Sequence, residues 1–167
     1  MGKVLETFSN GFPGTPSRTA DEVIITMQNG SEDPIACGEP VFIKSNGSCE
    51  GFDRDYPQEF SQFLGFAVRV PDKTPDSAVT GQNQDNPLAV WRPYETMEVL
   101  VRGAITVPMV TTAGRGSQVY LRKSDGRLVT SPGTANSTVE LANVRIRNEK
   151  DAASGCAEVI VNKRNII

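Results

Sequence analysis

Histidine is the most informative absence from this chain of 167 residues, which contains none. Without histidine, a serine or cysteine nucleophile lacks its usual activating base, and a metal site lacks its commonest ligand. The three cysteines do not compensate, because they are scattered and show no CxxC spacing: Cys37, Cys49 and Cys156. The composition therefore predicts a protein with no catalytic, cofactor-binding or metal-binding residues.

Long apolar runs and regions dominated by one sign of charge are also missing. No stretch is apolar over the length needed to cross a bilayer, and residues 1–7 lack the apolar centre of a secretory signal. The formal net charge is −3, and the basic residues form no stripe. We therefore expect neither a membrane nor a nucleic acid as a partner.

Two interpretations of the cysteines follow from the sequence. Cys37 and Cys49 would form a disulfide in an oxidising compartment. Buried free thiols agree better with the missing export signal, and we favour this interpretation.

Short β-branched runs separated by turn residues are what the chain does contain. Strands are expected at residues 22–27, 39–44, 63–70, 96–107, 117–122, 127–130, 143–147 and 156–163. Asp125-Gly126 between two such runs predicts a hairpin, and Gly65 predicts a bulge or a close backbone approach. No segment of helical length keeps a 3.6-residue apolar period. The predicted fold class is therefore all-β, a small antiparallel barrel or sandwich.

The longest of these runs, residues 96–107, is interrupted by Gly103. Its alternating apolar residues keep the same phase on both sides of the glycine. The pattern predicts that they share one face of the strand: Met97, Val99, Val101, Ile105 and Val107.

Residues 1–21 are predicted to form an extended N-terminal arm, and residues 22–167 the barrel or sandwich domain. The arm is rich in glycine and proline, yet it contains Phe8 and Phe12, and disordered tails are usually poor in aromatic residues. The two rings either pack back on the domain or dock on a partner. Deletion of residues 2–18 is expected to leave the fold intact.

Two local clusters suggest other functions. Asp53, Asp55 and Glu59 are carboxylates that a hydrolase would need in a cleft, although aspartates are also typical of solvated turns. Trp91 and Tyr94 would form a sugar-binding platform if both rings were exposed on one face. A small β domain more often buries its only tryptophan.

Several segments, in order and spacing, resemble one family. The segments are Ala36–Ile43 (ACGEPVFI), Phe63–Ala67 (FLGFA), Tyr94–Val107, Gly116–Leu121 with Asp125–Leu128, Asn143–Ile146 and Gly155–Val161. Over roughly residues 20–165 the chain resembles the capsid cement, or decoration, proteins of tailed bacteriophages. The family's usual turn before the fourth segment differs, since Gly114-Arg115-Gly116-Ser117 stands there.

The resemblance implies a structural virion protein, not an enzyme, that decorates the outer capsid surface and cements neighbouring major capsid proteins. It also implies self-association as a trimer or dimer, and assembly in the host cytoplasm. From their aromatic or basic side chains, the candidate contact residues are Phe8, Phe12, Arg18, Trp91 and Tyr94. The alternatives are another virion part, such as a head-fibre base or tail component, and a carbohydrate-binding β module.

Overall fold

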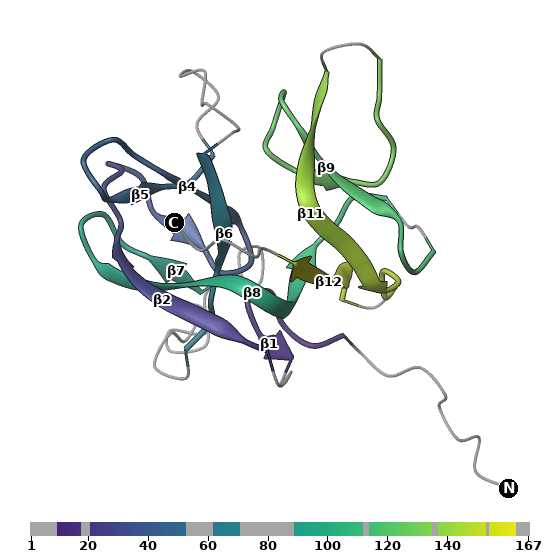
Figure 1. Cartoon of the computed structure of the whole chain (residues 1–167), viewed down its shortest axis with the longest axis horizontal. Coiled ribbons are helices and arrows are strands. Elements are labelled where there is room, and N and C mark those ends of the chain that lie inside the picture. The colour runs from purple at the N-terminus through teal and green to yellow at the C-terminus, as the bar shows by residue number, and fades with distance from the viewer. Residues whose placement is uncertain are drawn as a thin grey trace, which may run out of the picture.

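A computed structural model describes residues 10–17, 21–52, 62–70, 89–111, 114–134, 137–152 and 154–162 of the chain. Within these ranges the chain forms twelve β-strands and no α-helix (Figure 1). The strands build a curled antiparallel half-barrel, so the predicted all-β class is confirmed. The same ranges contain no helix that is long and apolar enough to cross a membrane.

The strands are numbered in the order in which they occur along the chain. They are β1 (Pro16–Ser17), β2 (Val23–Gln28), β3 (Ile35–Ala36), β4 (Pro40–Ile43), β5 (Cys49–Glu50), β6 (Phe63–Ala67), β7 (Val90–Trp91), β8 (Thr96–Pro108), β9 (Gln118–Arg122), β10 (Leu128–Val129), β11 (Thr138–Asn148) and β12 (Cys156–Asn162). Ten of them form one sheet in the order β10-β9-β11-β12-β8-β6-β4-β5, with β1 and β2 also paired to β8. The remaining pair, β3 and β7, forms a small separate sheet. Of the two-residue strands, only β10 lies within a predicted strand, that at residues 127–130. The longer strands lie close to their predicted positions, except that β11 begins five residues before its predicted start at residue 143.

Strand β8, with 13 residues, is the central element of the large sheet, where it pairs with β1, β2, β6 and β12. Its N-terminal half pairs with β2 on one edge and with β6 on the other. Its C-terminal half pairs with β12 and, on the opposite edge, with β1. The two ends of β8 therefore belong to two lobes, which Figure 1 shows on the left (β2 to β7) and on the right (β9 to β12).

The predicted single apolar face of β8 is wrong. The register with β2 shifts between Val23, which lies opposite Arg102, and Ile24, which lies opposite Leu100. This β-bulge adds a residue to β8 directly before Gly103, whose φ is +121°. A bulge of one residue reverses the side-chain alternation. Met97, Val99 and Val101 consequently lie in one hydrophobic core, and Ile105 and Val107 lie in another.

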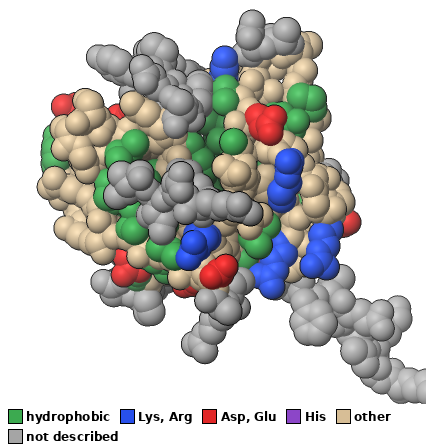
Figure 2. Space-filling view, viewed as in Figure 1, with side chains coloured by type: hydrophobic (Ala, Val, Ile, Leu, Met, Phe, Trp, Pro, Cys, Tyr) green, Lys and Arg blue, Asp and Glu red, His purple; other side chains and the backbone are tan. Residues whose placement is uncertain are grey.

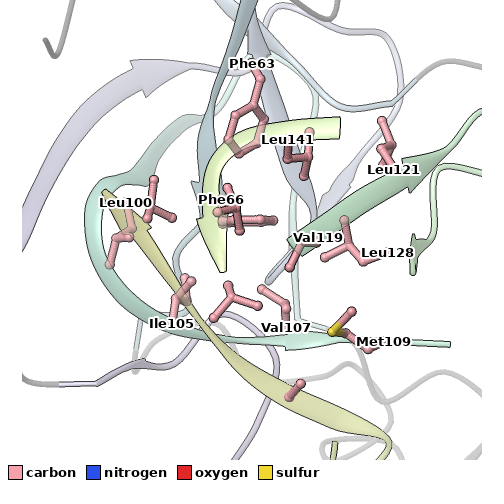
Figure 3. Packing of buried hydrophobic residues seen from close by; sticks show 14 of the residues in the cluster. Phe63, Phe66, Leu100, Ile105, Val107, Met109, Val119, Leu121, Leu128 and Leu141 are labelled. Atoms are coloured by element: carbon pink, nitrogen blue, oxygen red, sulfur yellow. The ribbon is translucent and has the colours of Figure 1, made fainter. Parts of the chain in front are cut away.

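The larger core, core 1, fills the right-hand lobe and reaches under β6 and β4 (Figure 3). Phe63 lies edge-on to Phe42 and Phe66, with ring centroids 6.0 and 5.4 Å apart, the favoured arrangement for aromatic pairs. Core 1 consists of Phe42, Phe63, Phe66, Val68, Leu100, Ile105, Val107, Met109, Val119, Leu121, Leu128, Leu141, Val144, Ile146, Ala157, Val159 and Val161.

The smaller core, core 2, fills the left-hand lobe. It consists of Ile35, Cys37, Val41, Cys49, Leu64, Ala67, Ala89, Trp91, Met97, Val99 and Val101. Three further side chains on β2 face core 2 but stay only partly buried: Val23, Ile25 and Met27. Core 2 is therefore less completely covered than core 1 along β2.

Strand β6 crosses β8 very closely at Gly65. A Cβ atom on this residue would lie 2.0 Å from the carbonyl oxygen of Leu100. The register with β4 also shifts here, because Val41 lies opposite Gly65 and Phe42 opposite Phe63. Both parts of the expectation for Gly65, a bulge and a close approach, are confirmed.

The hairpin predicted at Asp125-Gly126 is confirmed between β9 and β10. Gly126 has a φ of +69°, and the Nε atom of Arg122 donates to the carboxylate of Asp125 at 2.8 Å. This hydrogen bond lowers the pKa of Asp125 from its ordinary value. The side chains thus lock the turn that the glycine makes possible.

Candidate functional site

The candidate contact residues lie in different environments. The side chains of Phe12 and Tyr94 are 67% and 62% exposed, the two most exposed large hydrophobic residues in the described ranges. Trp91 is only 4% exposed and belongs to core 2. Phe8 and Arg18 lie outside the described residues, as do the carboxylates Asp53, Asp55 and Glu59.

Trp91 is removed from the candidate contacts by its burial. Its indole Nε1 donates to the carbonyl oxygen of Val68 at 2.9 Å, which satisfies the only polar atom of the ring. A sugar-stacking platform needs both Trp91 and Tyr94 on one exposed face, so that alternative is wrong. The tryptophan instead fixes the β3–β7 pair against β6.

The N-terminal segment, defined here as residues 10–17, is fastened to the body and does not project from it. The side-chain amide of Asn10 donates to the carbonyl oxygens of Glu149 at 2.7 Å and Cys156 at 2.9 Å. Gly14 donates its N–H to the carbonyl of Thr106 at 2.8 Å. These residues belong to the predicted extended arm, and their glycines and prolines allow a close fit against β8.

Gly14 shows why this fit depends on glycine. Its φ is +78°, and a Cβ atom would lie 2.7 Å from Cβ of Cys37 and 2.9 Å from the backbone oxygen of Ala67. Arg69 donates its N–H to the carbonyl of Gly14 at 2.7 Å. The segment therefore joins the residues that follow β6 to the C-terminal half of β8, and deletion of residues 2–18 would remove part of the body.

The C-terminal end of this segment reaches a buried carboxylate. Glu158 on β12 is 7% exposed and accepts hydrogen bonds from the hydroxyl of Ser17 and the amide of Asn148. The guanidinium of Arg147 lies 3.5 Å from the same carboxylate. These polar contacts compensate the burial of the charge and hold β1, β11 and β12 together.

Phe12 is the part of this segment that faces outward. The guanidinium carbon of Arg69 lies 4.7 Å from the centre of its ring, within the range of a cation–π contact. Because residues 10–17 are fixed, the ring is presented at a defined position. A partner that binds Phe12 would pay little entropy to order it.

Tyr94 occupies an unfavourable backbone conformation. The turn Arg92-Pro93-Tyr94-Glu95 closes with a hydrogen bond from the N–H of Glu95 to the carbonyl of Arg92, 3.2 Å. Tyr94 has a φ of +63°. With proline second and a positive φ third, this turn matches type II, whose third position favours glycine or asparagine. A tyrosine there costs about 1–2 kcal/mol.

Asn29 holds the strained turn in place from a fully buried position. Its side-chain amide donates to the carbonyls of Asp33, Trp91 and Arg92, at 3.1–3.3 Å. Its backbone carbonyl accepts the N–H of Tyr94 at 2.8 Å. Asn29 follows the strand predicted at residues 22–27, and its hydrogen bonds to distant segments have no local signature in the sequence.

No other group of side chains offers an obvious reactive site. The ranges given above hold no cluster of three or more cysteine, aspartate or glutamate residues suited to a metal ion. The three cysteines are free and buried, as favoured from the sequence. Burial raises the pKa of Cys49 to about 11, which keeps its thiol protonated and unreactive at neutral pH.

The two halves of the chain differ in charge. Residues 1–95 carry 14 acidic and 7 basic residues, a net charge of −7. Residues 96–167 carry 6 acidic and 10 basic residues, a net charge of +4. Figure 2 shows basic side chains gathered on the side of the molecule where β11 and β12 lie in Figure 1. The charge of the chain is therefore distributed unevenly along its sequence.

Comparisons with known proteins agree with the family suggested by the sequence motifs. A chain of the solved structure "The capsid of Myoviridae Phage XM1" matches with a TM-score of 0.65 and 19% identity, over 96% of each chain. This likeness establishes the fold alone. No curated protein sequence matches the chain. The family model described as "Structural cement protein (E217 gp24/Pam3 gp6)" matches residues 3–162. The chain therefore belongs to the family of phage structural cement proteins.

Proposed function

We propose that this structural protein decorates the outer surface of an assembled phage head and stabilises the head by binding across neighbouring major capsid proteins. The family match carries the proposal, because it spans both lobes and the N-terminal segment. This role needs a rigid body with exposed contact residues and no catalytic step. A protein that binds only the assembled lattice stabilises it by mass action.

Tyr94 is the best-supported capsid contact. Its ring is exposed, its backbone is strained, and the strain is maintained by the buried side chain of Asn29. Strain of this kind is found where a side chain must be presented for function. Tyrosine is also enriched among the residues that dominate binding energy at interfaces.

Phe12 and the residues that precede it form the second proposed contact. The fixed segment 10–17 presents the Phe12 ring, and the arm residue Phe8 lies four positions earlier in the chain. Arg18 follows the segment directly. We propose that all three bind the major capsid protein on heads that assemble in the host cytoplasm.

The proposal is tested by adding the purified chain to heads that lack it. We expect saturable binding with a copy number set by the capsid lattice, protection of the heads against heat, and no binding to unassembled capsid subunits. Labelling of the bound chain on intact heads by an antibody would place it outside. Binding to tails in preference to heads would contradict the proposal.

The contact residues are tested with variants that keep the body whole. Deletion of residues 2–9, in place of the longer deletion that would remove Asn10 and β1, should reduce occupancy of the heads at least tenfold. Phe12→Ser should have a smaller effect. The exposed residue Ala142 on β11 supplies a control, because Ala142→Ser changes a surface to which no contact is assigned. Equal occupancy for all variants would remove the N-terminal contact from the proposal.

A further inference from the structure

The triplet Asn-Gly-Ser occurs twice in the chain, and both copies form the same pattern of side-chain hydrogen bonds. They are residues 29–31, after β2, and residues 46–48, in the turn that joins β4 to β5 (Figure 1). In each copy the side-chain oxygen of the asparagine accepts two hydrogen bonds from the serine. Ser31 donates its N–H at 3.0 Å and its hydroxyl at 2.6 Å. Ser48 donates the same groups at 3.0 and 2.7 Å.

An asparagine that precedes a glycine is chemically labile, because it can lose its side-chain amide without an enzyme. The backbone nitrogen of the glycine attacks Cγ of the asparagine, and glycine hinders this attack least because it has no side chain. The two donors from the serine favour the attack, since they stabilise the negative charge that develops on the side-chain oxygen. Both triplets therefore contain the groups that the reaction needs, and their surroundings decide where it proceeds.

The surroundings of Asn29 oppose the reaction. Its side chain is fully buried, and its NH2 group donates to three backbone carbonyls at 3.1–3.3 Å. Gly30 donates its N–H to the carbonyl of Cys49 at 2.7 Å. A Cβ atom on Gly30 would lie 2.1 Å from the hydroxyl oxygen of Ser48, so this glycine has little room to move. Both the leaving amide and the attacking nitrogen are held in place.

The surroundings of Asn46 leave the reaction open. Asn46 and Gly47 are both exposed, and the NH2 group of Asn46 donates to no group in the part of the chain that the structure describes. Gly47 has a φ of +82°, and the space at its Cβ position is open. Its N–H donates to the carbonyl of Lys44 at 3.0 Å, a single bond that an exposed turn breaks by local opening. The leaving amide and the attacking nitrogen therefore both reach solvent.

We propose that Asn46 is a site of spontaneous deamidation and that Asn29 is protected from it. The nitrogen of Gly47 bonds to Cγ of Asn46 and gives its proton to hydroxide. The Cγ–Nδ2 bond breaks, and the amide nitrogen takes a proton from water and leaves as ammonia. Water then opens the resulting succinimide ring at one of its two carbonyls. Opening at the former side-chain carbonyl gives aspartate, and opening at the backbone carbonyl gives isoaspartate.

Three hydrogen bonds separate the two sites. The reaction at Asn29 requires the loss of its three amide hydrogen bonds, in addition to the glycine hydrogen bond that both sites must break. Each such bond changes an opening equilibrium by a factor of about five, so together they slow the reaction by about 100-fold. At both sites the rate should rise with pH, because the attacking nitrogen must lose its proton.

Isoaspartate at position 46 would also disturb the first triplet. Ser48 connects the two, because its hydroxyl donates to Asn46 and lies against Gly30. Isoaspartate adds one carbon atom to the backbone of the turn and displaces the acceptor of Ser48. Asn46→Asp introduces the same charge and keeps the acceptor in place. We therefore expect the isoaspartate form, purified by ion exchange, to denature at a lower guanidinium concentration than Asn46→Asp.

Incubation of the full chain in mildly alkaline buffer tests the proposal. Trypsin cleaves after Lys44 and places the two triplets in separate peptides, in which mass spectrometry measures the deamidated fraction. Methylation by an isoaspartate methyltransferase identifies the isoaspartate product. In the folded chain, Asn46 should react at least about 100-fold faster than Asn29. In denaturant the two should react at similar rates, because the triplets are identical in sequence.

Gly47→Ala is the matched chemical control. Its methyl group enters open space, so the variant should fold, and the group hinders the approach of the nitrogen to Cγ. Deamidation of Asn46 should then slow by at least about tenfold. Two results would overturn the proposal: equal rates at Asn46 and Asn29 in the folded chain, or an Asn46 that reacts only in denaturant. Neither measurement involves phage heads, so the proposed function is tested independently.

Discussion

The two lobes share strand β8 but differ in the composition of their cores and in the exposure of their margins. Core 1 is built from aliphatic and phenylalanine side chains with one methionine, Met109, at its margin. Core 2 contains two thiols, a methionine and the tryptophan, and its margin along β2 stays partly exposed. Asn29 and the strained Tyr94 turn lie at this margin. The lobe around core 1, here called the closed lobe, supplies rigidity. The lobe around core 2, here called the open lobe because its margin along β2 is partly exposed, carries the features suited to contact with other molecules.

The largest expected effect compares the two cores through one chemical change. Leu100 in core 1 and Leu64 in core 2 are 0% and 3% exposed. Leu100→Ala should lower the free energy of unfolding by about 4 kcal/mol, because the closed core cannot collapse around the cavity. Leu64→Ala should cost about 2–3 kcal/mol, since core 2 can adjust along β2. Guanidinium titrations measure both, and equal losses would show that core 2 is packed as tightly as core 1.

The second prediction concerns the polar centre of the open lobe. Asn29→Ala removes a buried amide that donates to three backbone carbonyls, so it should cost about 2–3 kcal/mol. Asn46 is the matched control, because it also precedes a glycine but caps an exposed turn through Ser48. Asn46→Ala should cost less than about 1 kcal/mol. If thermal unfolding shows similar losses, Asn29 does not organise the lobe.

The third prediction tests the fit of the N-terminal segment against the body. Gly11 and Gly14 both have positive φ, but a Cβ atom on Gly11 meets open space. Gly11→Ala should cost about 1 kcal/mol from backbone strain alone. Gly14→Ala should cost at least about 1 kcal/mol more, because its Cβ collides with Cys37 and Ala67. Equal denaturation midpoints would mean that the segment does not pack this closely.

The fourth prediction separates stability from binding in the two lobes. Tyr94 and Asn143 are the non-glycine residues with positive φ among the described residues. Tyr94→Gly should raise the free energy of unfolding by up to about 1 kcal/mol and reduce occupancy of phage heads. Asn143→Gly on β11 should change neither, because asparagine tolerates this conformation. A Tyr94→Gly variant that is stabilised and still saturates the heads would refute the capsid contact.

The smallest expected effect is a pH dependence in the open lobe. Burial raises the pKa of Glu39 above its ordinary value, opposed by a hydrogen bond from the N–H of Ala36. A raised pKa in the folded state means that this carboxyl favours folding at low pH, and that the contribution is lost as the pH rises through the folded pKa. Glu39→Gln should therefore be slightly more stable than wild type at pH 7 and equal to it at pH 3. Parallel curves of stability against pH would contradict this.

Much of the fold follows from local patterns in the sequence. Long strands such as β2, β8 and β12 have a period of two, and Asp125-Gly126 fixes its hairpin by local chemistry alone. Four of the two-residue strands, β1, β3, β5 and β7, were missed because tertiary contacts create them. The reversal of phase in β8 was also missed, because a bulge is specified by the partner strand.

The candidate site was less predictable than the fold. The exposed aromatic residues Phe12 and Tyr94 could be named from their type. Trp91 was named with them, although the only tryptophan of a small β domain is more often buried, as it is here. The close fit of residues 10–17 depends on β8 and Cys37, which are distant in sequence. The role of Asn29 likewise depends on carbonyls about 60 residues away.

The shared strand β8 also fixes the length of the protein as a spacer. An extended strand of 13 residues spans roughly 40 Å, and the same unbroken backbone runs through both lobes without a flexible linker. A displacement of one lobe is therefore transmitted to the other and is not absorbed between them. If the proposed contacts at Phe12 and Tyr94 both bind the capsid, this body holds them at one spacing, and a head that expands or shrinks away from that spacing would lose the protein.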